Sequence, residues 1–208
     1  MKIHLVRHAE TIWHCEDRYA GHTDIGLTPN GFEQANELKE WSKNQKIDAI
    51  YTSSLQRSIL TAQPTATALN IKAQEDTSFN EVNFGAIEGL TKSEFSSKFP
   101  ETWQEFQLRP ANTKFPEGET GEEALKRSLK SISKIIALDK YSELLVVSHG
   151  TLIRLLLTYW LSKDLNQYRK IFPTIDNVSI TTIALDYLAS GFPLDLNFRM
   201  YQYNSKLT

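Results

Sequence analysis

Two short, mostly apolar runs, each with a histidine just after its end, constrain the fold of this chain more than any other feature. The first covers residues 3–6 and leads into Arg7-His8. The second covers residues 144–148 and leads into His149-Gly150. Both runs have the length and composition of buried strands. Because ligands bind at the carboxyl ends of strands in an α/β sheet, we expect the two histidines, about 140 positions apart, to meet at one site.

Predicted strands and helices alternate along the chain. Residues 47–51 predict another strand, with one helix before it over 29–44 and a second helix after it over 57–69. Capping-box patterns begin at Thr91 and Thr120, and further strands are predicted over 178–185 and 194–201. This alternation predicts an α/β fold, a three-layer sandwich with a mostly parallel central sheet flanked by helices. Pro64 is expected to kink its helix or to begin a new one.

The length and composition predict one domain. The 208 residues, 40% of them hydrophobic and 23% charged, suit a globular chain with one sizeable core. Residues 84–120 differ from the rest because glycines, prolines and aromatic residues gather there. We therefore expect a single domain over 1–208 with a lid inserted at about 84–120, whose aromatic residues either pack the lid or contact a substrate.

Charge and cysteine content indicate which compartment and partners to expect. The net charge of −2 gives no reason to expect nucleic acid as a partner, and the apolar start is too short for a signal peptide. Cys15 has no second cysteine to pair with, and the apolar stretch 152–161 is cut by Arg154 and falls short of the ~20 residues of a membrane span. We expect a cytoplasmic protein without a membrane partner; the C-terminal strand pattern is compatible with a homodimer.

The residues around the two histidines suggest phosphoryl chemistry. A neutral imidazole such as that of His8 is a good nucleophile near pH 7, and the Arg7 guanidinium offers paired donors to phosphoryl oxygens. Arg57, at the start of a predicted helix, could reach the same crevice, and His149 would add a positive charge if protonated. Each residue alone is also compatible with a structural role. Their coincidence at strand ends favours a phosphohistidine mechanism.

Several separated blocks of the chain resemble one known family. Leu5-Val6-Arg7-His8-Ala9-Glu10-Thr11 resembles the signature around the nucleophile of the histidine phosphatase superfamily, in its phosphoglycerate mutase-like branch. Val146-Val147-Ser148-His149-Gly150 resembles its second histidine block. Further similar blocks lie at residues 18–24, 27–31, 53–58, 81–89 and 115–120, so the resemblance spans residues 3 to about 180.

The resemblance implies a role for each matching residue. His8 would take the phosphoryl group, Arg7, Arg57 and His149 would hold its oxygens, and Glu81 would be the proton donor. The substrate would be a small phosphorylated metabolite, because the family acts on compounds of that class. The residues expected to line the phosphate and substrate pocket are Arg7, Arg57, His149, His14, Gly150, Gly21 and His22.

Other interpretations of the same residues remain. His8, His149, Glu81 and His22 could instead ligate a metal, but their spacing matches no standard metal motif and two adjacent arginines would repel a cation. We therefore expect neither a metal nor another cofactor. Family members often have glycine where Ala9 stands, and mutases usually have asparagine where His14 stands. The compact block 81–85 favours hydrolysis over a mutase reaction, and a catalytically silent phosphate-binding module is the third possibility.

Overall fold

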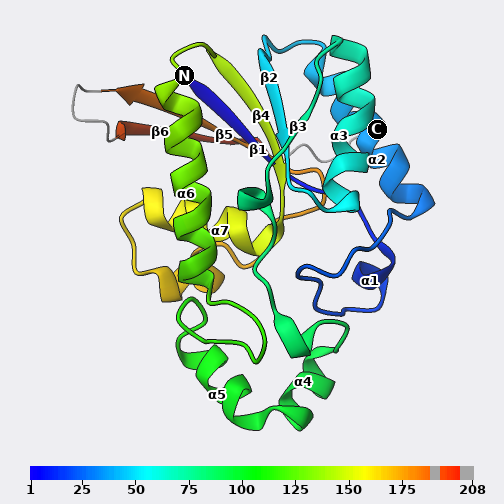
Figure 1. Ribbon diagram of the computed structural model, residues 1–208, viewed down its shortest axis with the longest axis vertical. Helices are drawn as coiled ribbons and strands as arrows, with labels where there is room; N and C mark the ends of the chain where they lie inside the picture. Colours follow the sequence, from blue (N-terminus) through cyan, green and yellow to red (C-terminus); the bar gives the residue numbers. More distant parts are fainter. Residues whose placement is uncertain (188–192, 202–208) are drawn as a thin grey trace.

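The fold is built around one six-stranded sheet, with the strand order β3-β2-β4-β1-β5-β6 (Figure 1). The computed structural model describes residues 1–187 and 193–201. Strands β1 to β4 pair in parallel, whereas β5 pairs antiparallel with both β1 and β6, so the predicted α/β class and mostly parallel sheet are confirmed. The strands are β1 (Lys2–Arg7), β2 (Ala49–Thr52), β3 (Gln74–Glu75), β4 (Glu143–Ser148), β5 (Ile180–Tyr187) and β6 (Pro193–Tyr201).

Side chains that alternate along the strands form two cores, one on each face of the sheet. On one face, Ile3 and Val146 join a cluster that contains Leu125 of the helix before β4 and Leu152 of the helix after it. On the other face, Val6 and the neighbouring strand residues contact the two helices that flank β2. Successive strand side chains point to opposite faces, so the apolar runs supply both cores and the sheet is buried on both sides.

The helices begin largely where the sequence patterns predict. The bounds are α1 (Ile12–Cys15), α2 (Pro29–Ser42), α3 (Gln56–Leu69), α4 (Lys92–Lys98), α5 (Pro100–Leu108), α6 (Gly121–Ala137), α7 (Gly150–Trp160) and α8 (Tyr168–Ile171), with short 3-10 turns at Thr77–Phe79, Gly85–Ile87 and Leu165–Gln167. Capping boxes are present at Thr91 and Thr120, as predicted. Within the described part of the chain, no helix is long and apolar enough to cross a membrane.

The expected new helix start at Pro64 is wrong. Helix α3 continues from Gln56 to Leu69 with Pro64 inside it. A proline removes one donor from the helical ladder, but α3 packs along α2 and buries Ala62 against Leu38. Tertiary packing of this kind outweighs the local preference of one residue.

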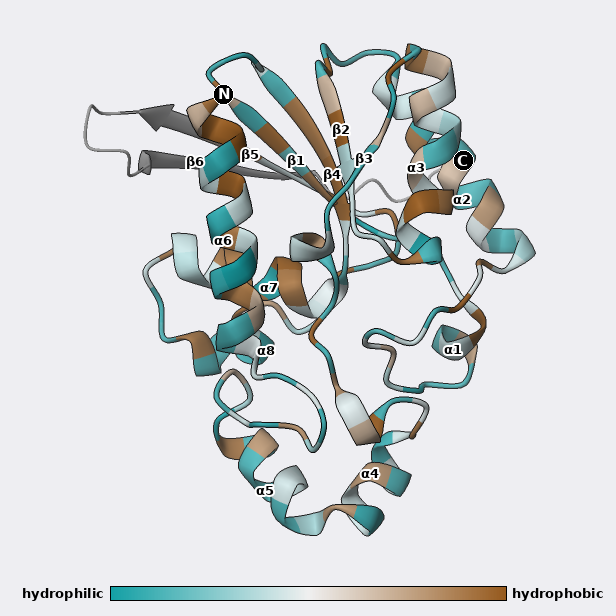
Figure 2. Ribbon diagram, in the orientation of Figure 1, coloured by the Kyte–Doolittle hydropathy of each residue, from teal (hydrophilic) through white to brown (hydrophobic). Residues whose placement is uncertain are grey.

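Residues 84–120 lie beyond the carboxyl ends of the parallel strands. Figure 1 shows α4 and α5 at the end of the molecule opposite the N-terminus. Figure 2 shows α7 in mostly hydrophobic colours, and α7 contacts both α6 and β1. An aromatic cluster anchors the 84–120 segment, with Phe95 and Phe115 buried and the Tyr19 ring 5.5 Å from that of Phe84. The segment therefore forms one wall above the strand ends.

Candidate active site

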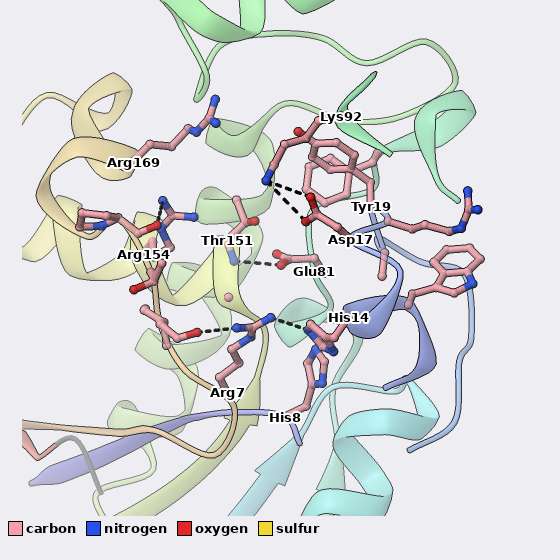
Figure 3. A pocket seen from close by; sticks show the side chains of 18 of the residues that line it. Arg7, His8, His14, Asp17, Tyr19, Glu81, Lys92, Thr151, Arg154 and Arg169 are labelled. Carbon is pink, nitrogen blue, oxygen red and sulfur yellow. Dashed lines mark hydrogen bonds and ion pairs between the residues drawn. The ribbon is translucent and has the colours of Figure 1, made fainter. Parts of the chain in front are cut away.

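A pocket of about 440 Å³ opens at the carboxyl ends of β1 and β4 (Figure 3). This volume suits a small metabolite. Five residues predicted for the site line it: Arg7, His8, His14, Glu81 and Gly150. The pocket is also lined by Trp13, Asp17, Arg18, Tyr19, Ala20, Phe84, Lys92, Phe106, Thr151, Arg154, Tyr168, Arg169 and residues 173–176.

His8 is held in one orientation at the bottom of the pocket. Its side chain is buried, and its Nδ1 lies 2.7 Å from the carbonyl oxygen of Ala9. A carbonyl oxygen only accepts, so Nδ1 carries the proton and Nε2 carries the lone pair. Burial lowers the pKa of His8 well below its usual value, and the charges of Arg57 and Arg7 lower it further. His8 is thus neutral at pH 7, with Nε2 as a nucleophile.

The Arg7 guanidinium is fixed beside His8. It donates to the carbonyl oxygen of Ile175 and contacts Nε2 of His14. Its Nε is buried without a hydrogen-bond partner among the described residues. Nη1 and Nη2 each carry a second N–H group, and these donors are available to an anion in the pocket. A Cβ on Gly150 would lie 3.3 Å from that Nε, tighter than ordinary contact. The absence of a side chain at Gly150 therefore leaves room for the guanidinium.

Arg57 and His149 lie behind His8 and are not among the residues that line the pocket. Both are fully buried, and the His8 and His149 rings are 5.1 Å apart. Arg57 donates from Nε to Nδ1 of His149 at 3.3 Å, and His149 contacts the Ser53 hydroxyl through Nε2 at 2.8 Å. Burial, followed by the charge of Arg57, lowers the pKa of His149 well below its usual value. His149 is therefore neutral in this structure.

Arg57 is positioned by backbone carbonyls. Its Nη1 donates to Thr23 at 2.9 Å and its Nη2 donates to Gly21 at 2.5 Å. Three of its five N–H groups are thus engaged, counting the bond to His149, and the side chain is fully buried. Burial lowers the pKa of Arg57 to about 10, so the side chain is cationic at pH 7.

The Glu81 carboxylate sits at the amino-terminal end of α7. Its Oε2 accepts from the backbone N–H of Thr151 at 2.9 Å, and its Oε1 accepts from that of Leu152 at 3.0 Å. The first N–H groups of a helix have no partners within the helix, so they are free to hold the Glu81 carboxyl oxygens in place. Figure 3 shows Glu81 pointing into the pocket above Arg7 and His8.

Arg127, which the sequence analysis did not single out, fixes the backbone on which Glu81 stands. From α6 it donates to the carbonyl oxygens of Ser78, Asn80 and Glu81, each at 2.8 Å. The same guanidinium pairs with Glu119 at 2.8 Å. No local signal at Arg127 indicates this role, because the carbonyl groups that it holds lie about 50 positions away in sequence.

Gly21 and His22 do not line the pocket but support residues that do. The Gly21 carbonyl holds Arg57, as described above, and His22 lies with Nε2 2.9 Å from the Glu81 carbonyl oxygen. A Cβ on Gly21 would lie 2.7 Å from the Val82 carbonyl oxygen, so only glycine fits this position. The structure therefore places both residues in the support of Arg57 and Glu81.

His14 packs directly against the nucleophile and its neighbouring arginine. The His14 and His8 rings are 5.3 Å apart, and Nδ1 of His14 lies 3.0 Å from the backbone nitrogen of Thr11. Burial, with the charges of Arg7 and Arg57, lowers the pKa of His14 to about 4. The side chain is therefore neutral at pH 7 and adds no positive charge to the pocket.

Four cationic pocket residues lie outside the set predicted from the sequence: Arg18, Lys92, Arg154 and Arg169. Arg154 had a usable signal, because a charged residue inside the apolar stretch 152–161 must face a polar region. The other three carry no comparable signal, because none of them lies inside a long apolar stretch. Among the residues that the structure describes, no three His, Cys, Asp or Glu side chains are arranged to hold a metal ion.

Comparison with known proteins decides the family. Residues 3–192 match the family model described as "Histidine phosphatase superfamily (branch 1)". The chain belongs to the histidine phosphatase superfamily. This confirms the resemblance found in the sequence, and members of the superfamily are phosphatases or mutases.

Individual relatives of this histidine phosphatase carry different names. The chain is 28% identical over 199 residues to "Probable phosphoglycerate mutase GpmB" of Erwinia tasmaniensis, covering 94% of this chain and 91% of the relative. It is 28% identical over 186 residues to "Phosphoserine phosphatase 1" of Hydrogenobacter thermophilus, covering 89% and 87%. The alpha-ribazole phosphatase from Shigella flexneri shares the fold, with a TM-score of 0.85, 22% identity and coverage of 97% and 96%.

Proposed function

We propose that this protein is a metal-independent phosphatase that hydrolyses a small phosphomonoester through a phosphohistidine intermediate on His8. One observation carries the proposal. The Ala9 carbonyl holds Nδ1 of His8, so the neutral Nε2 faces a pocket in which Arg7 has a donor available. A neutral nucleophile beside fixed cations is the arrangement that in-line phosphoryl transfer requires.

In the first step, Nε2 of His8 attacks phosphorus and the bond from phosphorus to the ester oxygen breaks. Arg7 stabilises the equatorial oxygens, and Arg57, held in place by His149 behind His8, adds a buried positive charge close to the reacting group. The leaving alkoxide takes a proton from Glu81, which must be protonated before this step. The products are phosphohistidine and the free alcohol.

In the second step, the Glu81 carboxylate takes a proton from water while the water oxygen attacks phosphorus. The bond from phosphorus to Nε2 breaks, which releases inorganic phosphate and regenerates neutral His8 and protonated Glu81. One carboxyl group thus serves as acid and then as base, as microscopic reversibility allows. Arg127 and the N-terminal amides of α7 keep this carboxyl group in position throughout.

A mutase is the second candidate function. It is supported by the similarity to a relative named as a phosphoglycerate mutase. A mutase would return the phosphoryl group from His8 to the substrate and would depend on a bisphosphorylated primer. The compact sequence block after Glu81 supports hydrolysis instead. A silent phosphate-binding module would not need both a nucleophile and an acid, and this chain has both.

The test is hydrolysis of p-nitrophenyl phosphate in excess EDTA by the wild-type protein and the His8→Ala variant. We expect turnover by the wild type and a loss of at least about 10³-fold in the variant, because the variant lacks the attacking Nε2. Retained turnover in His8→Ala would overturn the phosphohistidine mechanism. Turnover that EDTA abolishes would overturn metal independence, and phosphate binding without turnover would indicate the silent module.

A further inference from the structure

The outer part of the pocket carries positive charge that the transfer of one phosphoryl group does not use. The lining residues include five cations, Arg7, Arg18, Lys92, Arg154 and Arg169, and three carboxylates, Asp17, Glu81 and Asp176. Lys92 pairs with Asp17 at 3.2 Å, and Arg18 pairs with Glu16 at 2.6 Å. Two of the cations are therefore already neutralised by neighbouring carboxylates.

Arg154 and Arg169 form no ion pair with any residue that the structure describes. Arg154, on α7, donates to the carbonyl oxygens of Phe172 at 2.6 Å and Pro173 at 3.2 Å. Arg169, on α8, lies over the Phe106 ring, 4.7 Å from its centroid. Both guanidinium groups are thus held in place by neutral partners, which leaves their charges available to a ligand.

The two arginines lie on the same side of the pocket and act on each other. Burial lowers the pKa of Arg154, and the positive charge of Arg169 also lowers it. Tyr168 directly precedes Arg169 and is buried. Burial raises the pKa of its hydroxyl group, so Tyr168 supplies no negative charge at pH 7. Figure 3 shows Arg154 between Arg7 and Arg169, with Thr151 and Glu81 beside it.

We propose that Arg154 and Arg169 form a second anion subsite, so that the substrate is a compact phosphomonoester carrying a second anionic group, a carboxylate or a second phosphate. This inference rests on the proposed phosphatase function and selects among its substrates. The phosphoryl group would bind between His8 and Arg7, and the second anion would bind beside the two outer arginines. The volume of about 440 Å³ fits a compound of this size.

The test compares substrates that differ by one anionic group. 3-Phosphoglycerate has a carboxylate where glycerol 3-phosphate has a hydroxymethyl group, and fructose 1,6-bisphosphate has a phosphate where fructose 6-phosphate has a hydroxyl group. We expect the wild-type kcat/KM to favour the anionic member of at least one pair by about tenfold or more. The first pair reports on a carboxylate and the second on a second phosphate.

The Arg169→Gln variant assigns this preference to the subsite. We expect its ratio of kcat/KM between the members of the preferred pair to fall by about tenfold, because one charge-assisted bond is lost. Arg109→Gln, directly after the end of α5 and outside the pocket, removes an exposed arginine and should keep the wild-type ratio.

The outcomes separate this inference from the proposed function. Turnover of p-nitrophenyl phosphate with no preference within either pair would overturn the second subsite and leave the phosphatase function intact. A preference that Arg169→Gln retains would also overturn the assignment of this subsite. Failure to hydrolyse p-nitrophenyl phosphate and all four metabolites would overturn the phosphatase function itself, and this inference with it.

Discussion

At the scale of single residues, the chemistry of this site depends on which side-chain atoms already form hydrogen bonds within the protein. His8 uses Nδ1 for the Ala9 carbonyl, which leaves Nε2 for attack, whereas His149 has contacts at both ring nitrogens. The two histidines therefore differ in role, although both follow strands and both are buried. The two arginines also differ in position, because Arg7 lines the pocket and Arg57 lies behind it.

The proposed acid role of Glu81 predicts a dependence on the leaving group. Glu81→Gln keeps the shape of the side chain but cannot donate a proton as a carboxylic acid does. We expect hydrolysis of alkyl phosphates, whose alkoxides need protonation, to slow by about 10²- to 10⁴-fold. Hydrolysis of p-nitrophenyl phosphate should slow much less, because p-nitrophenolate leaves without a proton.

Single-turnover kinetics measure this difference, because they isolate the step in which the ester bond breaks. Asn83 lies two positions after Glu81, and its side-chain oxygen accepts a hydrogen bond from the backbone N–H of Gly85. Asn83→Ala therefore serves as a control for local distortion. It should affect alkyl and aryl phosphates equally. An equal loss for both substrate classes in Glu81→Gln would count against the acid role.

At the scale of elements, the amino-terminal end of α7 organises the site. Gly150 opens the helix and leaves space for Arg7, and the next two residues donate their backbone N–H groups to Glu81. The segment before β5 adds a second support, because Asn177 donates to the His8 carbonyl at 2.9 Å and Ile175 accepts from Arg7. Nucleophile, cation and acid are thus positioned by two backbone segments.

The close approach at Gly150 predicts a cost for any side chain there. In Gly150→Ala, the new Cβ would lie 3.3 Å from Nε of Arg7, which is held by Ile175 and His14 and has little freedom to move. We expect kcat/KM for p-nitrophenyl phosphate to fall by about tenfold or more, because small displacements of positioning groups are costly.

Gly26→Ala is the matched control for this prediction. A Cβ at Gly26 meets no atom within 4 Å, so this variant should keep kcat/KM within about twofold of the wild-type value. Thermal unfolding of both variants separates loss of stability from loss of activity. Wild-type activity in Gly150→Ala would show that Arg7 has more freedom than its contacts indicate.

At the scale of the whole molecule, burial disfavours the charged form of several histidines. Burial is the first cause of the lowered pKa of His4, His8, His14 and His149. In the unfolded chain these groups have a pKa near 6.5, so at mildly acidic pH the unfolded state binds more protons than the folded state. The free energy of unfolding must therefore decrease as the pH falls below about 6.5.

This linkage predicts how stability depends on pH. Urea unfolding should give a stable plateau between pH 7.5 and 8.5, where these histidines are neutral in both states, and decreasing stability from pH 6.5 towards pH 4. Each neutral buried histidine adds up to about 1.4 kcal/mol per pH unit to the slope. His14, with a pKa of about 4, contributes over most of this range.

The His14→Asn variant tests this contribution. It should reduce the slope between pH 6.5 and about 4 by up to about 1.4 kcal/mol per pH unit, because one titrating group is removed. The slope between pH 7.5 and 8.5 should be the same in both proteins. Stability that increases between pH 7 and pH 5 would contradict the burial of neutral histidines.

The sequence by itself determined the framework of this protein. Apolar runs of strand length, alternating with capped amphipathic helices, specify a parallel sheet covered on both faces. Local patterns place His8 and His149 each just after a strand, at the end where ligands bind. The pairing of β1 with β4, which brings these two ends side by side, is set by the tertiary structure. The family could be recognised from local patterns, because its motifs are short and contiguous.

Only the tertiary structure decided which atoms of these residues are available. It placed Arg57 and His149 behind His8, set Glu81 on the amides of α7, and brought Arg154 and Arg169 to the outer pocket. It also kept α3 continuous across Pro64, where a new helix start had been one of the two expectations. The physical reason is that hydrogen bonds, burial and packing join residues far apart in sequence, whereas sequence patterns report mainly on neighbours along one element.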